Sequence, residues 1–201
     1  GMSAGIGSIF KSPLGGALFG IEVLYKRDFE MSAIVPAIMS SVIGYAIFTH
    51  FVGREPIFLT CHCIFENPLE LIFYGLLGLI CAAVGIFYIW FFYSARDKFF
   101  RRLKIPDHVK PAIGGIGIGV LIILFPDLVS GIIGSGYGAL QDALLGNLAL
   151  SAMILLILAK ILATSFTVGS GGSGGVFAPS LVIGGMVGGV VGELSHIFFP
   201  N

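Results

Sequence analysis

The glycine-rich segment at residues 169–179 is the part of the chain best suited to bind a ligand. It reads GSGGSGGVFAP and leads into an apolar stretch, residues 176–199, that is long enough for a membrane helix. Glycines let a ligand meet the backbone, and the positive end of the following helix points at the same place. We therefore predict that backbone N–H groups hold a bare anion here, weakly enough for fast release. A flexible loop and a helix-packing run of glycines are the structural alternatives.

Three ionisable residues fall within or beside apolar stretches, where charge is costly and often functional. Glu22 and Glu193 lie near expected helix ends. In the structural interpretation, their side chains reach the lipid headgroups and have no further role. Lys160 lies inside the apolar run 148–168. It could face an anion path, or it could neutralise the exposed carbonyls of a broken helix. The sequence leaves both interpretations of Lys160 open.

The composition makes the lipid bilayer the expected environment. Hydrophobic residues make up 56% of the chain and charged residues only 11%, against roughly a quarter in soluble domains. Eleven acidic and eleven basic residues cancel, so no global field favours nucleic acid as a partner. No nucleophile with a base and no phosphate-binding loop with its lysine is recognisable. We predict a protein that is not an enzyme and has no cofactor.

The cysteines do not indicate a metal site. Cys61, His62 and Cys63 form a single run that lacks a second pair of ligands, and Cys81 stands apart. The expected arrangement is a small polar loop and one buried thiol.

Several apolar runs predict the helices that position these residues. They span residues 13–25, 31–51, 69–93, 111–125, 148–168 and 176–199, the first being short. Pro126 should end the fourth run because proline cannot continue a helix. Residues 129–145 are interrupted by glycines and predict a short helix or a partial insertion. The predicted fold is an all-α, polytopic, multi-pass membrane protein, with the cell membrane as the expected location.

Basic residues predict the orientation, because cytoplasmic loops carry an excess of Lys and Arg. One basic loop holds Lys26 and Arg27. The other holds Arg96, Lys98, Arg101, Arg102, Lys104 and Lys110. Two spans separate these loops, so both can face the cytoplasm, while residues 52–68 face outward. Nucleic-acid binding is the weaker interpretation of the second loop, because membrane spans flank it.

Four segments together resemble the CLC family of chloride channels and chloride/proton exchangers. Residues 174–179, GGVFAP, look like the family's GxFxP signature, and residues 8–22 resemble its stretch with Pro-Leu-x-Gly followed by Ile-Glu. Residues 134–138, GSGYG, and 160–165 also look like the family's second half. The motifs occur in the family's order, and the resemblance covers essentially the whole chain.

The resemblance implies an inverted-repeat helical domain with broken helices, in which anions are held where helix ends meet. On this mapping residues 1–50 close the first half, residues 51–68 link the halves, and residues 69–201 supply much of the second. The family's GSGxP and GREGP segments, the latter with the gating glutamate, are expected ahead of these residues. A late helix with a pore tyrosine is expected after them.

Carried over residue by residue, the resemblance assigns the backbone amides of Val176 and Phe177 to the central anion, with Pro179 fixing the helix start. The predicted anion site comprises Gly174, Gly175, Val176, Phe177, Ala178 and Pro179. Glu22 matches the first member of the exchangers' acidic pair, so it is the possible proton path. Val23 occupies the place of the second acid and offers no titratable group. A channel or an uncoupled transporter is therefore favoured, with a proton-coupled antiporter as the alternative.

The expected function is transport of chloride or a similar small anion, whose identity the sequence does not rank. A non-transporting membrane scaffold is the alternative from another class, and a transporter of another solute would need charged or aromatic ligands. The resemblance also implies a homodimer, with residues 13–25 and 31–51 at the interface. Ala17, Gly20 and Gly44 are compatible with such a surface.

Overall fold

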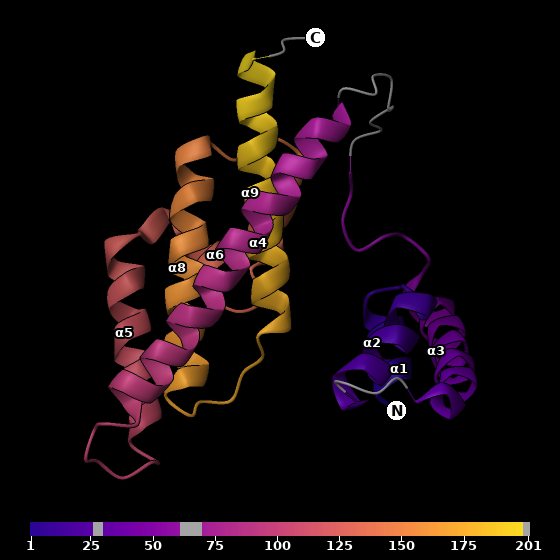
Figure 1. The fold of residues 1–201 in the computed structure, drawn as a ribbon, viewed down its shortest axis with the longest axis horizontal. Coiled ribbons are helices and arrows are strands. Elements are labelled where there is room, and N and C mark those ends of the chain that lie inside the picture. Colours follow the sequence, from indigo (N-terminus) through magenta and orange to yellow (C-terminus); the bar gives the residue numbers. More distant parts are fainter. Residues whose placement is uncertain (26–29, 61–69, 199–201) are drawn as a thin grey trace. The chain divides into compact units, whose positions relative to one another are not determined.

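The computed structural model describes residues 1–25, 30–60 and 70–198, and throughout this part of the chain the regular structure is helical. Figure 1 shows the helices α1 (Met2–Ile9), α2 (Pro13–Tyr25), α3 (Met31–Val52), α4 (Glu70–Ser94), η1 (Ala95–Phe100), α5 (Lys110–Leu124), η2 (Pro126–Leu128), α6 (Val129–Ile132), α7 (Tyr137–Leu144), α8 (Leu150–Gly169) and α9 (Phe177–Phe198). This confirms the all-α, polytopic fold. Lys26, Arg27, Cys61, His62 and Cys63 lie outside the described residues.

The chain forms two compact units, Gly1–Leu59 and Thr60–Asn201, which divide within the segment predicted as a linker. Among the described residues, four helices are long and apolar enough to cross a membrane: Met31–Val52, Leu71–Phe100, Leu150–Gly169 and Phe177–Ser195. The assignment of the units to two inverted halves stays a prediction.

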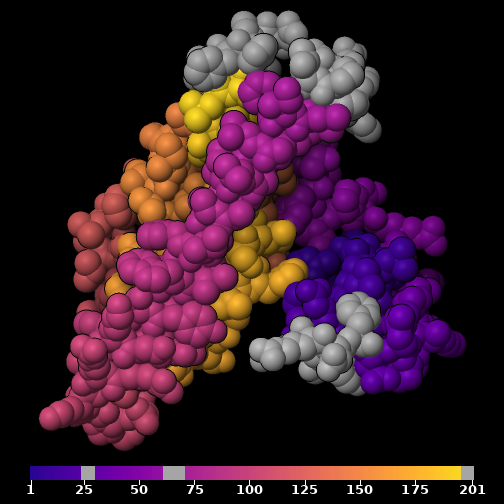
Figure 2. Space-filling view, in the orientation of Figure 1, coloured from indigo at the N-terminus to yellow at the C-terminus, as the bar shows by residue number. Residues whose placement is uncertain are grey.

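In the first unit, α1, α2 and α3 pack against one another through small residues. Gly7 of α1 meets Gly16 of α2 backbone to backbone, and a Cβ at Gly16 would also lie 2.9 Å from the carbonyl oxygen of Ser3. Gly20 packs against Ser3 in the same way. Small residues allow this approach because they place no side chain between two helix backbones. The three helices therefore form a dense cluster, drawn in indigo and purple in Figure 2.

These contacts correct the interpretation of three residues as a dimer surface. Ala17 is fully buried within the unit, Gly20 is covered by α1, and a Cβ at Gly44 would lie 3.0 Å from that of Ala4. Their side of α2 and α3 is thus occupied by α1 of the same chain. The sequence pattern could not show this, because a small-residue face fits an intrachain helix as well as a second copy.

In the second unit, α8 is the central helix. Half of its membrane-length window is buried, against 6% for Leu71–Phe100, because α4, α5 and α9 all pack against it. Figure 1 shows α8 between α5 and α9. Tyr88 of α4, Ile161 of α8 and Ile183 of α9 form one hydrophobic cluster at this junction. A core of this kind places both ends of α8 firmly.

The region after α5 is broken, as the proline and the glycines predict. Phe125 ends α5, Pro126 follows, and the pair Lys110–Leu124 and Pro126–Ile132 is bent by 110°. Residues 129–145 then form α6 and α7 instead of one span, which confirms the short-helix interpretation. The backbone reverses between these helices at Gly134 and Gly136, whose φ angles are 60° and 77°. Glycine adopts this left-handed conformation without steric cost.

Three of the six basic residues after α4, Arg96, Arg101 and Lys110, form ion pairs within the segment. Arg96 contacts Asp97 at 2.8 Å and lies 4.5 Å from the centre of the Tyr93 ring. Lys110 contacts Asp107 at 2.7 Å, and this hydrogen bond holds the pKa of the Asp107 carboxyl below its usual range. Such pairs suit an exposed face at the membrane boundary. The cytoplasmic orientation stays a prediction.

Candidate anion-binding site

The first glycines of the candidate site end α8. Gly171 has a φ of 92°, its N–H donates to Val168 O at 3.1 Å, and the N–H of Gly172 donates to Thr167 O at 3.0 Å. This pair of bonds is the Schellman arrangement, which closes a helix with a left-handed glycine. The start of the GSGGSGG run is therefore a structured turn.

The remaining glycines of the turn divide into packed and open positions. A Cβ at Gly172 would lie 2.7 Å from Thr167 O, and one at Gly174 would lie 3.1 Å from Val168 Cγ2. At Gly175, by contrast, a Cβ would meet nothing within 4 Å. The helix-packing interpretation thus accounts for Gly172 and Gly174 but leaves Gly175 unexplained.

The opening at Gly175 leads directly to the start of α9. Val176 and Phe177 are 46% and 39% exposed, Ala178 is half-buried and Pro179 is buried. Ser180 N–H donates to Val176 O at 3.1 Å and forms the first backbone bond of the helix. N–H groups ahead of that bond point out along the helix axis, where the macrodipole is positive. Proline is tolerated here because the first turn needs no hydrogen bond from its nitrogen.

The turn itself contributes backbone dipoles and no side-chain charge, since residues 169–180 contain no charged side chain. The hydroxyl of Ser180 donates to Phe177 O at 2.8 Å and lies 2.9 Å from Val176 O, so it is turned back onto the helix. An arrangement of oriented N–H dipoles attracts an anion without the deep trap of a buried cation. It can therefore bind and release a small anion.

Packing beneath the turn involves residues that the sequence analysis missed. Phe100 of η1 is buried against Phe166, with ring centres 6.2 Å apart. A Cβ at Gly114 of α5 would lie 2.5 Å from Phe166 O and 2.6 Å from Ser170 Oγ. Ser170 is itself buried, and its hydroxyl donates to Thr167 O at 2.9 Å. Helices α5 and η1 thus fix the end of α8, where the turn begins.

Lys160 does not face an anion path. Its side chain is 2% exposed, and its Nζ donates to the carbonyl oxygens of Gly131, Ile132 and Gly134 at 3.0, 3.2 and 2.9 Å. An ammonium group has three N–H donors, and three carbonyls account for all of them. Of the two interpretations left open, the structure confirms that Lys160 neutralises the end of a broken helix.

The acidic candidates belong to helices and not to this turn. Glu22 is exposed on α2 of the first unit, beside the exposed Val23, and Glu193 is exposed near the end of α9. Exposed positions near helix ends allow both carboxylates to reach the headgroups, as the structural interpretation requires. The role of Glu22 in a proton path stays a prediction.

These features define a class of protein: a multi-pass helical membrane protein with broken helices and a glycine-rich turn that opens at the start of one helix. The chain belongs to the voltage-gated chloride channel family, whose family model matches residues 1–201. This confirms the CLC resemblance found in the motifs.

Three relatives illustrate the family match. The chain is 34% identical, over 96% of its length, to an uncharacterized protein of Methanocaldococcus jannaschii. It is 30% identical to the voltage-gated ClC-type chloride channel ClcB of Citrobacter koseri, and 29% identical to the H(+)/Cl(-) exchange transporter ClcA of Yersinia pestis, each over its full length. It covers 48%, 47% and 42% of these three proteins, so it spans about half the length of the curated relatives it matches.

Proposed function

We propose that the protein to which this chain belongs transports chloride or a similar small anion across a membrane. The observation that carries the proposal is the turn before α9, which is open at Gly175 and exposed at Val176 and Phe177, with no charged side chain in residues 169–180. The proposed site comprises Gly174, Gly175, Val176, Phe177, Ala178 and Pro179. The names of two relatives, a chloride channel and a chloride exchanger, support the choice of ligand.

Within this function we favour channel-like or uncoupled movement over proton-coupled exchange. The reason is Val23, an apolar side chain at the position that matches the exchangers' inner proton acid. Moving a proton through an apolar stretch needs a titratable group or an ordered chain of water. The neighbouring Glu22 is the residue that would supply the group in an antiporter.

We also propose a homodimer, formed through apolar side chains that the first unit leaves exposed. On α3 these recur every fourth residue and form one stripe: Val35, Met39, Ile43, Ile47 and Phe51. Leu14 and Leu18 of α2 are also exposed. These side chains replace Ala17, Gly20 and Gly44 as the expected contact surface. A monomeric mass of the full-length protein in mild detergent would contradict the dimer.

Anion efflux from vesicles tests the transport function. Purified full-length protein in chloride-loaded vesicles should release chloride when valinomycin balances the charge. Val176→Pro, which removes one backbone N–H, should slow efflux about tenfold, as expected for the loss of one hydrogen bond to a charged group. Val176→Ala keeps the N–H and serves as the matched control. Efflux no faster than from empty vesicles would favour the non-transporting scaffold.

A pH indicator inside the same vesicles tests coupling. Under a chloride gradient we expect chloride movement without uphill proton movement. Uphill proton movement would contradict the uncoupled mechanism, and Glu22→Gln would then be expected to abolish it while chloride flux remains.

A further inference from the structure

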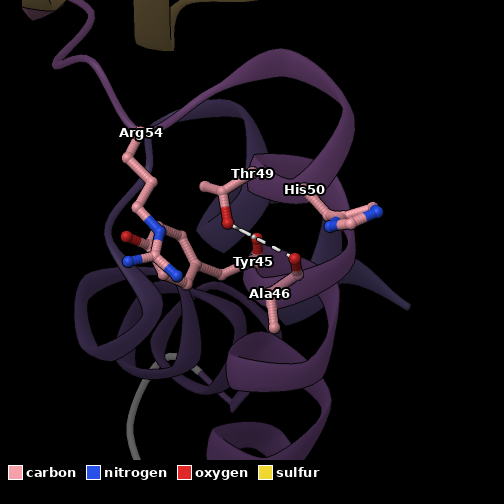
Figure 3. Close-up of a pocket in the computed structure, with 5 residues that line it drawn as sticks. All are labelled: Tyr45, Ala46, Thr49, His50 and Arg54. Atoms are coloured by element: carbon pink, nitrogen blue, oxygen red, sulfur yellow. Dashed lines mark hydrogen bonds between the residues drawn. The ribbon is translucent and has the colours of Figure 1, made fainter.

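A pocket lies at the end of α3, in the first unit. It has a volume of about 450 Å³ and is lined by Tyr45, Ala46, Thr49, His50 and Arg54 (Figure 3). The first four residues belong to the last two turns of α3, and Arg54 follows the helix C-cap, Gly53. The pocket lies within the first unit, and the proposed transport function makes no use of it.

The donors that face the pocket are those of Arg54, His50 and Tyr45. The Thr49 hydroxyl is already committed, because it donates to Tyr45 O at 2.9 Å and lies 3.3 Å from Ala46 O. Figure 3 shows Arg54 extending down toward the level of the Tyr45 ring, while the imidazole of His50 points to the opposite side. A ligand beside Arg54 would thus meet a guanidinium group and a phenol, while His50 lines the far side of the pocket.

The charge around the pocket favours an anion. Within the described residues, no ion pair or hydrogen bond is recorded for the guanidinium group of Arg54. Lys11 Nζ donates to the backbone carbonyl oxygen of Glu55, which brings a second cation to the residue next to Arg54. The carboxylate of Glu55 offsets one of these two charges, so a positive charge remains. A guanidinium without a carboxylate partner has its full fork of N–H donors available.

The depth and size of the pocket narrow the class of anion. The α3 helix Met31–Val52 is long enough to cross a membrane, so its last turns lie near the depth of the lipid headgroups. A halide ion or a bare phosphate ion fills only a small part of 450 Å³, since a water molecule occupies only about 30 Å³. A phosphate group carried on a larger molecule suits the volume, and the guanidinium fork binds phosphate oxygens in pairs.

We propose that the pocket formed by Tyr45, Thr49, His50 and Arg54 binds a phosphate group, carried either by a lipid headgroup or by a soluble phosphate. Arg54 binds the phosphate oxygens in this site, Tyr45 donates to them from the pocket wall, and His50 lines the far side of the pocket. The site depends on charge and on donor geometry at one end of α3. It requires neither anion transport nor the turn before α9.

Ligand-dependent unfolding of the purified full-length protein in detergent tests the site. The probes are short-chain phosphatidylglycerol, diacylglycerol with the same chains, and inorganic phosphate. Phosphatidylglycerol should raise the unfolding temperature of the wild type, because a ligand that binds the native state stabilises it. Arg54→Gln should raise the apparent Kd about tenfold or more, as expected for the loss of a paired charged contact. Arg54→Lys keeps the charge but not the fork and should fall in between.

The control variant is Arg102→Gln, which removes an exposed cation of the other unit and should leave the Kd unchanged. A shift with inorganic phosphate equal to that with the lipid would identify a soluble phosphate as the ligand, and a shift with the lipid alone would identify a headgroup. The proposal is overturned if neither probe shifts the wild type, if diacylglycerol reproduces the shift, or if Arg54→Gln and Arg102→Gln behave alike. Retained chloride efflux in Arg54→Gln would show that the variant is folded.

Discussion

Glycines serve opposite purposes at two places in this chain. In the first unit, the Cβ position of Gly16 is filled by the backbone of Gly7, that of Gly7 by the side chain of Ser41, and that of Gly20 by Ser3. In the turn before α9, Gly175 faces open space at the start of a helix. The same residue type therefore brings helices together in one place and exposes backbone donors in the other. What a glycine does is decided by what occupies the space where its Cβ would be.

The largest loss of stability is expected from a substitution of Lys160, the single cation that binds the carbonyl groups at the end of α6. Lys160→Met would leave the carbonyls of Gly131, Ile132 and Gly134 buried without their donor, at a cost of about 3 kcal/mol or more. Denaturant unfolding of the full-length protein measures this change. Lys104→Met removes an exposed ammonium and serves as the control. Any Lys160→Met protein that folds should keep the wild-type ratio of chloride to bromide efflux, and a changed ratio would mean that Lys160 contacts the anion.

The second-largest loss of stability is expected at Gly16 of the first unit, whose Cβ position is occupied by the backbone of Gly7. Gly16→Ala places a methyl group against the backbone of Gly7, which cannot move as a side chain can, so we expect destabilisation by about 1–3 kcal/mol. Gly5→Ala, on the exposed side of α1, is the matched control and meets nothing within 4 Å. Equal unfolding midpoints for the two variants would contradict the idea that an occupied Cβ position decides the cost of the substitution.

A matched pair on α5 tests the packing beneath the turn. Gly114→Ala collides with Phe166 O and Ser170 Oγ, and we expect a loss of about 1–2 kcal/mol after the helix propensity gained by alanine is included. The neighbouring Gly115 has nothing within 4 Å, so Gly115→Ala should be neutral or stabilising. If α5 positions the turn, Gly114→Ala should also change the chloride concentration for half-maximal flux. An unchanged value would limit Gly114 to a role in stability.

The smallest effect on stability is expected at the open glycine. Gly175→Ala meets no atom within 4 Å, so its unfolding free energy should change by less than about 0.5 kcal/mol. Chloride efflux should nevertheless fall several-fold, because the methyl group occupies the space through which an anion reaches the backbone. Wild-type efflux in this variant would show that the anion approaches from elsewhere.

Much of the fold follows from local patterns in the sequence. The apolar runs predict the membrane helices, and Pro126 ends α5 where a proline must. The sequence alone predicts the glycine-rich turn and the helix start at Pro179. The conformational freedom of glycine and the position of proline in a first turn are local properties.

The features that the sequence did not predict are contacts between segments that are distant in the sequence. The partners of Lys160 lie 26 to 29 residues upstream, and no periodicity connects them. Gly114 was passed over because a helix glycine that packs looks the same as its neighbour Gly115, which does not. The sequence made Ala17, Gly20 and Gly44 compatible with a dimer surface for the same reason, although α1 covers them within the first unit. Only the three-dimensional arrangement shows which element fills a space.

The bond between Lys160 and the end of α6 also bears on how the chain is made. A ribosome synthesises α6 well before Lys160, which lies 29 residues after Gly131, so the exposed carbonyls of α6 emerge ahead of the cation that satisfies them. Helices as short as α6 and α7 cannot cross a bilayer alone, and unpaired carbonyls are costly in lipid. This segment must therefore stay in a hydrated environment, such as the insertion channel, until α8 has been translated. We therefore expect this segment to enter the membrane only together with α8, which brings the cation that its carbonyls require.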